Sequence, residues 1–182
     1  MQARQHAVVL VGHGGIPSDY PRERVRRWRA LHTARQHDGG EITAEEEALE
    51  LALRRHPRTP QTDPYKFGLE SLAERLARRL GERPLYVAYN EFCAPSIPEA
   101  VMQAVRDRAR RITLVSTMMT PGGSHAQIEI LALARELQVA HPTVDIRYAW
   151  PFDPDAVAAL LHAQVERFDP PAVTVTRLRS AP

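Results

Sequence analysis

The sequence has a single cysteine, a single lysine and no long hydrophobic run, and the first and last of these shortages each exclude a class of protein. Cys93 is the single cysteine, which excludes an internal disulfide and a zinc site built on cysteine ligands. No apolar run approaches the length that spans a membrane, and the first residues lack the apolar core of a signal peptide. We therefore expect a protein of the reducing cytoplasm with no membrane partner.

No charge of one sign dominates the chain either. The 24 Lys and Arg residues nearly balance the 22 Asp and Glu residues, and the resulting net charge of +2 does not indicate nucleic-acid binding. The 182 residues, 43% hydrophobic and 25% charged, are typical of one globular domain. Lys66 is the only lysine. The arginine bias suits an anionic ligand, since a guanidinium binds carboxylate or phosphate with two donors, or it reflects a GC-rich genome.

Short apolar runs alternate with segments of helical periodicity. Strands are expected over residues 7–11, 85–89, 112–115 and 144–148, with a short edge strand over 173–175. Helices are expected over residues 22–35, 43–56, 65–80, 95–110, 126–139 and 153–168. The alternation predicts an α/β fold with three layers, in which helices flank a mostly parallel four-stranded sheet.

The predicted domain organisation is a single domain over residues 1–182, with a helical insertion over 16–64 after the first strand. Thr43 and Glu46 have the spacing of a capping box, which predicts the start of a helix within the insertion. The arginine-rich run from Arg22 to Arg29 forms either a lid over an anionic substrate or a solvated helix face.

Three side chains able to bind a metal follow three of the predicted strands. His13 lies between glycines after the first strand, Glu91 follows the second, and His125 ends the loop after the third. Ligands of parallel sheets bind beyond the carboxyl ends of the strands, so we expect these side chains to meet there. Two imidazoles and a carboxylate suit a first-row divalent metal with open coordination positions. Each histidine could instead have a purely structural role, His13 at the end of a strand and His125 at the cap of a helix.

The segments around these residues resemble the class II chelatases of the CbiX/SirB type. Residues 10–15, Leu-Val-Gly-His-Gly-Gly, resemble the opening motif of that family. Residues 90–100 resemble its segment of a glutamate, Pro-Ser-Ile and a helix, and residues 118–130 resemble its Gly-x-His motif followed by an acidic residue and Ile. The three segments occur in the order of the family.

The resemblance implies insertion of Co2+ or Fe2+ into sirohydrochlorin without ATP, in cobalamin or sirohaem biosynthesis. It implies that His13 and His125 handle the metal and the pyrrole protons, with Glu91 as the third catalytic and metal-binding residue. Substrate contacts are expected from four glycines and a serine of the motifs: Gly14, Gly15, Ser96, Gly122 and Gly123. The resemblance also implies that the metal is a substrate, which can be Co2+, Fe2+ or Ni2+, and that no cofactor is tightly bound. A homodimer is expected in preference to a monomer.

Several positions depart from the family pattern, and other readings stay open. Gly15, Thr117, Glu129 and Leu131 replace the more usual Ser, Pro, Asp and Pro. The same three residues also suit a non-catalytic protein that binds or delivers a divalent metal or a tetrapyrrole. A histidine phosphatase is a third reading, but Gly12 occupies the position of its usual arginine. Imidazole and carboxylate accept Fe2+, Co2+, Ni2+ and Zn2+ alike, so the sequence does not select the metal.

The remaining histidines, the cysteine and the tryptophans are expected to have structural roles rather than catalytic ones. Surface positions are expected for five histidines: His32, His37, His56, His141 and His162. Cys93 is expected to be a small packing residue. Trp28 and Trp150 are expected to be packing anchors, or to flank a flat macrocycle.

Overall fold

The sheet is four-stranded and wholly parallel in the computed structural model, which describes residues 5–169. Its strand order is β2-β1-β3-β4. The strands are β1 (His6–Gly12), β2 (Leu85–Tyr89), β3 (Arg111–Ser116) and β4 (Asp145–Tyr148). Each pair of neighbours is parallel, with Val9 of β1 opposite Tyr86 on one side and Leu114 on the other. The predicted parallel sheet is confirmed, and it places the carboxyl ends of all four strands along one edge.

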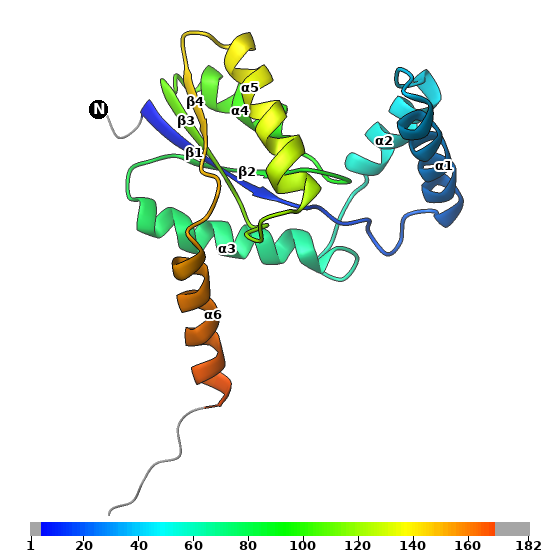
Figure 1. Cartoon of the computed structure of the whole chain (residues 1–182). Helices are drawn as coiled ribbons and strands as arrows, with labels where there is room; N and C mark the ends of the chain where they lie inside the picture. The colour runs from blue at the N-terminus through cyan, green and yellow to red at the C-terminus, as the bar shows by residue number, and fades with distance from the viewer. Residues whose placement is uncertain (1–4, 170–182) are drawn as a thin grey trace, which may run out of the picture. The chain divides into compact units, whose positions relative to one another are not determined.

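Helices cover both faces of the sheet. The helices of the described residues are α1 (Arg22–Asp38), α2 (Ala44–Arg54), α3 (Pro64–Leu80), α4 (Ile97–Arg106), the π-helix η2 (His125–Glu129), α5 (Ile130–Ala140) and α6 (Pro154–Phe168). Figure 1 shows α3 on one face of the sheet and α4 with α5 on the other. The predicted three-layer α/β fold is confirmed.

The alternation of side chains along β1 explains the two layers of core. Ala7, Val9 and Val11 are fully buried in the cluster that β1 shares with α4 and α5. Leu10 points the other way, into a smaller cluster with Leu69 of α3. Because both faces of a central parallel strand are buried, its sequence is a continuous apolar run rather than an alternating one.

Helix ends differ from the predicted bounds where the backbone leaves the helical region. The helix expected over 95–110 ends at Arg106, and Arg108 has a φ of 67°, which α-helical backbone does not allow. The capping box expected from Thr43 and Glu46 is only half formed. The Thr43 hydroxyl accepts a hydrogen bond from the Glu46 N–H, but the Glu46 carboxylate turns away from Thr43, into the interface between α1 and α2.

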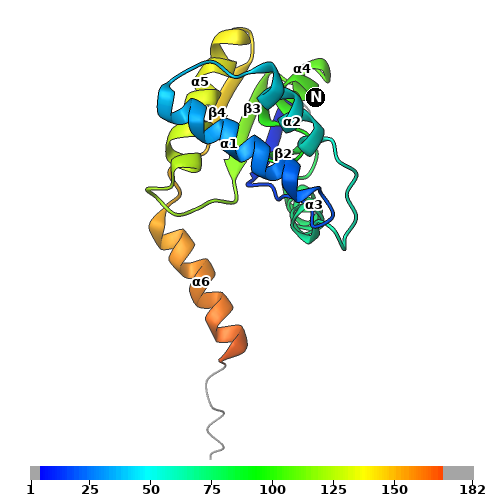
Figure 2. The ribbon, with the colours of Figure 1, turned by 90° about the vertical axis from the view of Figure 1, so that its right-hand side faces the viewer.

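A polar contact joins α1 to α2. Glu46 is fully buried, and its carboxylate accepts hydrogen bonds from Arg35 Nε at 3.0 Å and 3.1 Å and contacts His32 Nδ1 at 3.1 Å. The His32 ring stacks on Trp28 with centroids 4.8 Å apart. His32 is therefore half-buried, and so is His56, whose ring packs edge-on against Tyr20. The expected surface position is wrong for both. Figures 1 and 2 show α1 and α2 beyond the carboxyl end of β1.

The chain divides into two compact units, residues 1–150 and 151–182, and each is described by itself. The first contains the sheet and the helices up to α5. The second contains α6, whose start is set by Asp153, since its carboxylate accepts a hydrogen bond from the Asp155 N–H at 2.9 Å. The strand expected over 173–175 lies outside the described residues. Among the helices of residues 5–169, none is long and apolar enough to cross a membrane.

Candidate metal site

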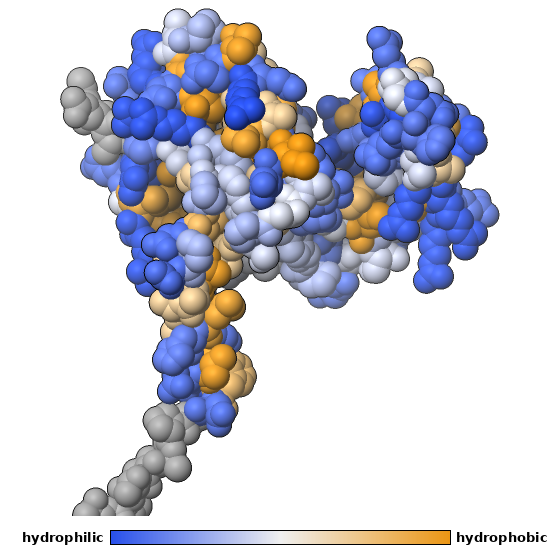
Figure 3. Space-filling model, in the orientation of Figure 1, coloured by the Kyte–Doolittle hydropathy of each residue, from blue (hydrophilic) through white to orange (hydrophobic). Residues whose placement is uncertain are grey.

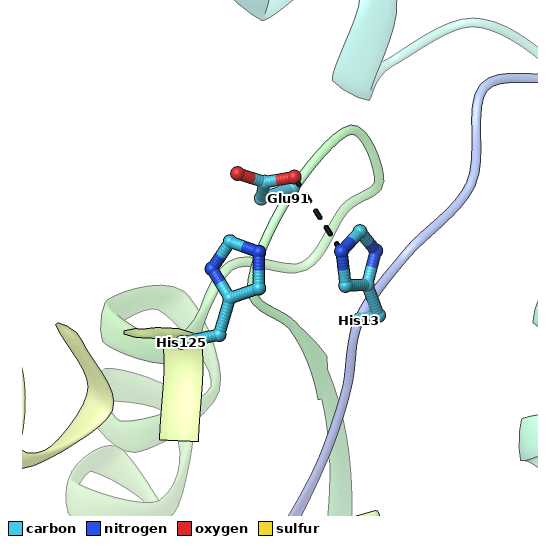
Figure 4. Close-up of side chains that lie close together, drawn as sticks. All are labelled: His13, Glu91 and His125. Carbon is cyan, nitrogen blue, oxygen red and sulfur yellow. Dashed lines mark ion pairs between the residues drawn. The ribbon is translucent and has the colours of Figure 1, made fainter. Parts of the chain in front are cut away.

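His13, Glu91 and His125 lie together at the carboxyl edge of the sheet (Figure 4). One donor atom from each lies within 4.8 Å of the other two. His13 Nε2 lies 3.8 Å from Glu91 Oε2, and the two imidazole rings are nearly perpendicular, with centroids 4.9 Å apart. The side chains are 40%, 27% and 29% exposed, in the order given, so a ligand can reach them from solvent.

Backbone hydrogen bonds hold the loops of His13 and Glu91 against each other. The Asn90 N–H donates to the Gly12 carbonyl at 2.9 Å, and the Glu91 N–H donates to the His13 carbonyl at 2.8 Å. Gly14 has a φ of 97°, and a Cβ at this position would lie 1.9 Å from the Glu91 carbonyl oxygen. Only glycine satisfies both conditions, so Gly14 is what allows the two loops to approach.

Hydrogen bonds at Nδ1 orient both imidazoles. His13 Nδ1 lies 2.8 Å from the Gly14 carbonyl oxygen, and His125 Nδ1 lies 2.8 Å from Glu129 Oε2. A carbonyl or a carboxylate can only accept, so each Nδ1 is assigned the proton and each Nε2 keeps its lone pair. The Asn90 amide nitrogen, 3.1 Å from His125 Nδ1, then donates to Glu129 and not to the ring. This pairing of a histidine with an acceptor on its far nitrogen is the usual support of a metal-binding imidazole.

Glu129 and Asn90 complete the support of His125, and the sequence analysis assigned neither of them a role. Asn90 Nδ2 donates to Glu129 Oε2 at 3.2 Å. Partial burial alone raises the pKa of Glu129, but the hydrogen bonds from His125 and Asn90 outweigh it and the pKa is lowered. Glu129 therefore stays a carboxylate able to hold the His125 ring. The sequence does contain one signal for the contact between His125 and Glu129. Their spacing of four residues places both side chains on one face of a helix.

The segment that carries His125 is a single turn of π-helix. The Ile130 N–H donates to the His125 carbonyl, five residues back, and Ala126 is buried beneath the turn. Single π turns are frequent at functional sites. The preceding loop is fastened to the same turn, because the Gly122 N–H donates to Gln127 Oε1 at 2.8 Å and the Gln127 N–H donates to the Gly123 carbonyl at 3.0 Å.

Ser96 and Gly15 have local partners in the structure. Ser96 is the N-cap of α4 and forms a complete capping box with Glu99, whose carboxylate accepts from the Ser96 hydroxyl at 3.0 Å. The Gly15 carbonyl accepts a hydrogen bond from Arg58 at 2.6 Å. Substrate contacts from the five motif residues stay a prediction.

Arg58 is a buried support of the site that the sequence pattern did not reveal. Its side chain is 3% exposed and forms an ion pair with the equally buried Asp63. Its guanidinium also donates to the carbonyls of Gly15, Leu53 and Phe92. It thus joins the loop after His13 to the loop that carries Glu91.

Phe92 adopts an unusual backbone conformation beside Glu91. Its φ of 57° lies in the left-handed region, which costs a bulky side chain about 1–3 kcal/mol. The ring contacts His13 at a centroid distance of 6.1 Å and Trp28 edge-on at 5.4 Å. Hydrogen bonds from Arg54 to the carbonyls of Asn90 and Cys93, both at 3.2 Å, help to hold this strained loop.

The three donors fit a metal after a small contraction. Donors bound at about 2.1 Å around one ion lie roughly 3–3.5 Å apart, so atoms separated by up to 4.8 Å must close by roughly 1–2 Å. The donor set has no thiolate and leaves several coordination positions open. Such a site suits an ion that is exchanged better than one that is held permanently.

The sequence profile of the CbiX family matches residues 62–168, which is more than half of the chain. The chain belongs to the CbiX family. The matched region contains Glu91 and His125, whereas His13 and both helices of the predicted insertion lie before it. The family predicted from the three motifs is confirmed.

Two solved structures share the fold of this CbiX-family chain. The CbiX protein of Marinobacter aquaeolei VT8, assigned to cobalamin (vitamin B12) biosynthesis, is 20% identical with a TM-score of 0.51, over 90% of this chain and 98% of that one. SirB from Bacillus subtilis with Fe3+ is 18% identical with a TM-score of 0.50, over 89% of this chain. This chain covers 47% of the SirB chain, about half its length. Among curated proteins, none matches the sequence.

Proposed function

We propose that this CbiX-family protein is a chelatase that inserts Co2+ or Fe2+ into sirohydrochlorin without ATP, in cobalamin or sirohaem biosynthesis. The observation that carries the proposal is the convergence of two Nε2 lone pairs and one carboxylate at an open sheet edge. Family membership supports the reaction class. The SirB structure holds iron as Fe3+, and the Marinobacter protein is assigned to cobalamin biosynthesis; both support a protein that handles a metal ion.

The reaction replaces two pyrrole protons by one divalent ion and releases two protons. The metal must shed water, and the protons need acceptors close to the centre of the macrocycle. The lone pairs of His13 and His125 can bind the ion or accept one pyrrole proton each, and Glu91 offsets the charge of the cation. Both imidazoles are partly exposed, so the protons can pass on to water.

The partners of the imidazoles support this proton transfer. When His125 takes a proton at Nε2, its ring becomes an imidazolium, and the Glu129 carboxylate on Nδ1 stabilises that charge. His13 has a neutral carbonyl in the same position. We therefore assign His125 the larger share of proton acceptance and His13 the larger share of metal binding.

An absorbance assay tests the proposal. Purified protein at limiting concentration is mixed with sirohydrochlorin and Co2+ or Fe2+, and loss of the metal-free spectrum is followed against a protein-free control. We expect many turnovers, and a loss of about 10²-fold or more in His13→Ala and His125→Ala. His37→Ala is the matched control, because His37 is 88% exposed and, among the described residues, pairs only with its neighbour Asp38. A spectral change that stops at one equivalent contradicts catalysis and indicates a binding or delivery protein.

A further inference from the structure

Three arginines on one face of α1 have no acidic partner within residues 5–169. Arg22, Arg26 and Arg29 follow the i, i+4, i+7 spacing of a helix face, and all three are exposed. Two other arginines of the same helix are paired, since Arg27 forms two hydrogen bonds of 2.6 Å with Glu45 and Arg35 contacts Glu46. The free guanidinium groups are therefore available to an anionic ligand.

The three arginines line a surface groove of about 430 Å³. The groove is completed by the segment before the helix and by one helical position: Ile16, Pro17, Ser18, Tyr20 and Val25. Pro17 is almost fully buried and Tyr20 is 5% exposed. The packing of these two side chains therefore fixes the position of this side of the groove. An apolar wall with several arginines suits an organic ligand that carries carboxylates.

The local electrostatics also favour an anion. The groove lies at the N-terminal half of α1, where the helix dipole is positive, and the N-cap Pro21 supplies no side-chain hydrogen bond. The nearby carboxylate of Asp19 lies against His56 rather than an arginine, with His56 Nε2 3.2 Å from Asp19 Oδ1. Glu23 is the one acid in the first turn of α1, so the three groove arginines outnumber the acids beside them.

The groove and the candidate metal site are close along the chain and are linked by side-chain contacts. Ile16 follows His13 by three residues, so their Cα atoms lie at most about 11 Å apart. Trp28 of α1 touches Phe92, and Phe92 touches His13, which links the helix to the metal site by side-chain contacts. Figure 3 shows a recess between the α1–α2 side and the body of the sheet, with hydrophilic surface over α1.

We propose that this groove binds peripheral carboxylates of the tetrapyrrole while the centre of the ring lies at His13, Glu91 and His125. The inference rests on the proposed function and adds a carboxylate subsite to it. The subsite is built from residues 16–29, which lie outside the region matched by the CbiX profile. Arginine suits this task because a guanidinium pairs with a carboxylate through two parallel hydrogen bonds.

The test compares two double variants of the full-length protein that remove the same charge from the same helix. Arg22→Gln/Arg26→Gln removes two groove arginines, and Arg24→Gln/Arg27→Gln removes two arginines that do not line the groove. The probe is uroporphyrin, a metal-free octacarboxylate porphyrin, and its dissociation constant is measured by fluorescence titration at two salt concentrations. Mesoporphyrin, a dicarboxylate, is titrated in parallel.

We expect the groove variant to raise the Kd for uroporphyrin about tenfold and to weaken its salt dependence, with a smaller effect on mesoporphyrin. The matched control should stay within about twofold of wild type. Equal effects of the two double variants, or equal effects on the two porphyrins, overturn the inference. So does an absence of uroporphyrin binding by the wild type. Inorganic phosphate is added as a competitor at millimolar concentration. If it displaces uroporphyrin, the groove is a phosphate site and the inference is wrong.

The metallation assay separates this inference from the function on which it rests. If the wild type metallates sirohydrochlorin and both double variants have an unchanged KM, the subsite is wrong and the chelatase assignment stands. If the wild type does not metallate but the groove variant alone loses uroporphyrin binding, the subsite is supported and the chelatase assignment fails.

Discussion

Replacing Arg58 by alanine should destabilise the protein more than any surface substitution. The guanidinium is 3% exposed and is paired with Asp63, which is also 3% exposed. Removing one partner of such a buried pair leaves the other charge without compensation and costs about 3–5 kcal/mol. The carbonyls of Gly15, Leu53 and Phe92 lose a donor in addition. Against a typical total of about 5–15 kcal/mol, this loss is large.

A second substitution identifies the buried pair as the cause. Asp63→Ala removes the acceptor, together with the N-cap hydrogen bond to the Lys66 N–H, which contributes about 1 kcal/mol. In Arg58→Ala/Asp63→Ala no buried charge is left unpaired. The double variant should therefore lose less than the sum of the two single losses, by about 1–3 kcal/mol.

The assay is urea denaturation followed by tryptophan fluorescence and by far-ultraviolet circular dichroism, which also shows whether the variants fold. Arg55→Ala is the control, because Arg55 is exposed at the end of α2 and should change stability by less than about 0.5 kcal/mol. A loss below about 1 kcal/mol in Arg58→Ala, or strict additivity in the double variant, would refute the reasoning.

Four further predictions concern the site and the assembly. Gly14→Ala should abolish metallation and lower the melting temperature, because a Cβ at this φ meets the Glu91 carbonyl; activity and calorimetry check this. Glu129→Gln should slow metallation about 10–100-fold while the melting temperature changes little, since the carboxylate orients His125; an equal rate contradicts it. The Cys93 thiol is buried, which raises its pKa, so a thiol reagent should react at mildly alkaline pH only after unfolding; rapid reaction of the folded protein contradicts it. We also propose a homodimer, because the chain carries one set of the three motifs; light scattering should then give twice the 20.5 kDa chain mass, and a monomer mass contradicts it.

The sheet was the most predictable part of the fold. Residues 85–89 form β2 with the predicted bounds, and the other strands shift by one residue at their ends. A strand buried on both faces has a continuous apolar run, which is a strong signal. The contact between α1 and α2 depends instead on the buried carboxylate of Glu46, with Arg35 and His32 around it. From sequence alone, polar residues of this kind are predicted to lie on the surface. This explains the wrong expectation for His32.

The candidate site was predictable as far as the sheet determines it. His13, Glu91 and His125 each follow a parallel strand, and the topology alone brings such positions to one edge. The supports of the site were not predictable in the same way. Arg58 donates to the Gly15 carbonyl and Asn90 donates to the Glu129 carboxylate, and both acceptors are distant in the sequence. Individual hydrogen bonds of this kind leave no periodic pattern.

The central claim is catalysis by the paired imidazoles, and the most direct measurement is the rate of sirohydrochlorin metallation by wild type, His13→Ala, His125→Ala and the double variant at limiting protein. The account predicts many turnovers for the wild type. It also predicts that the double variant is little slower than either single variant, because residues that act as one unit lose their function together. A double variant that retains the wild-type rate above the protein-free background would contradict the account.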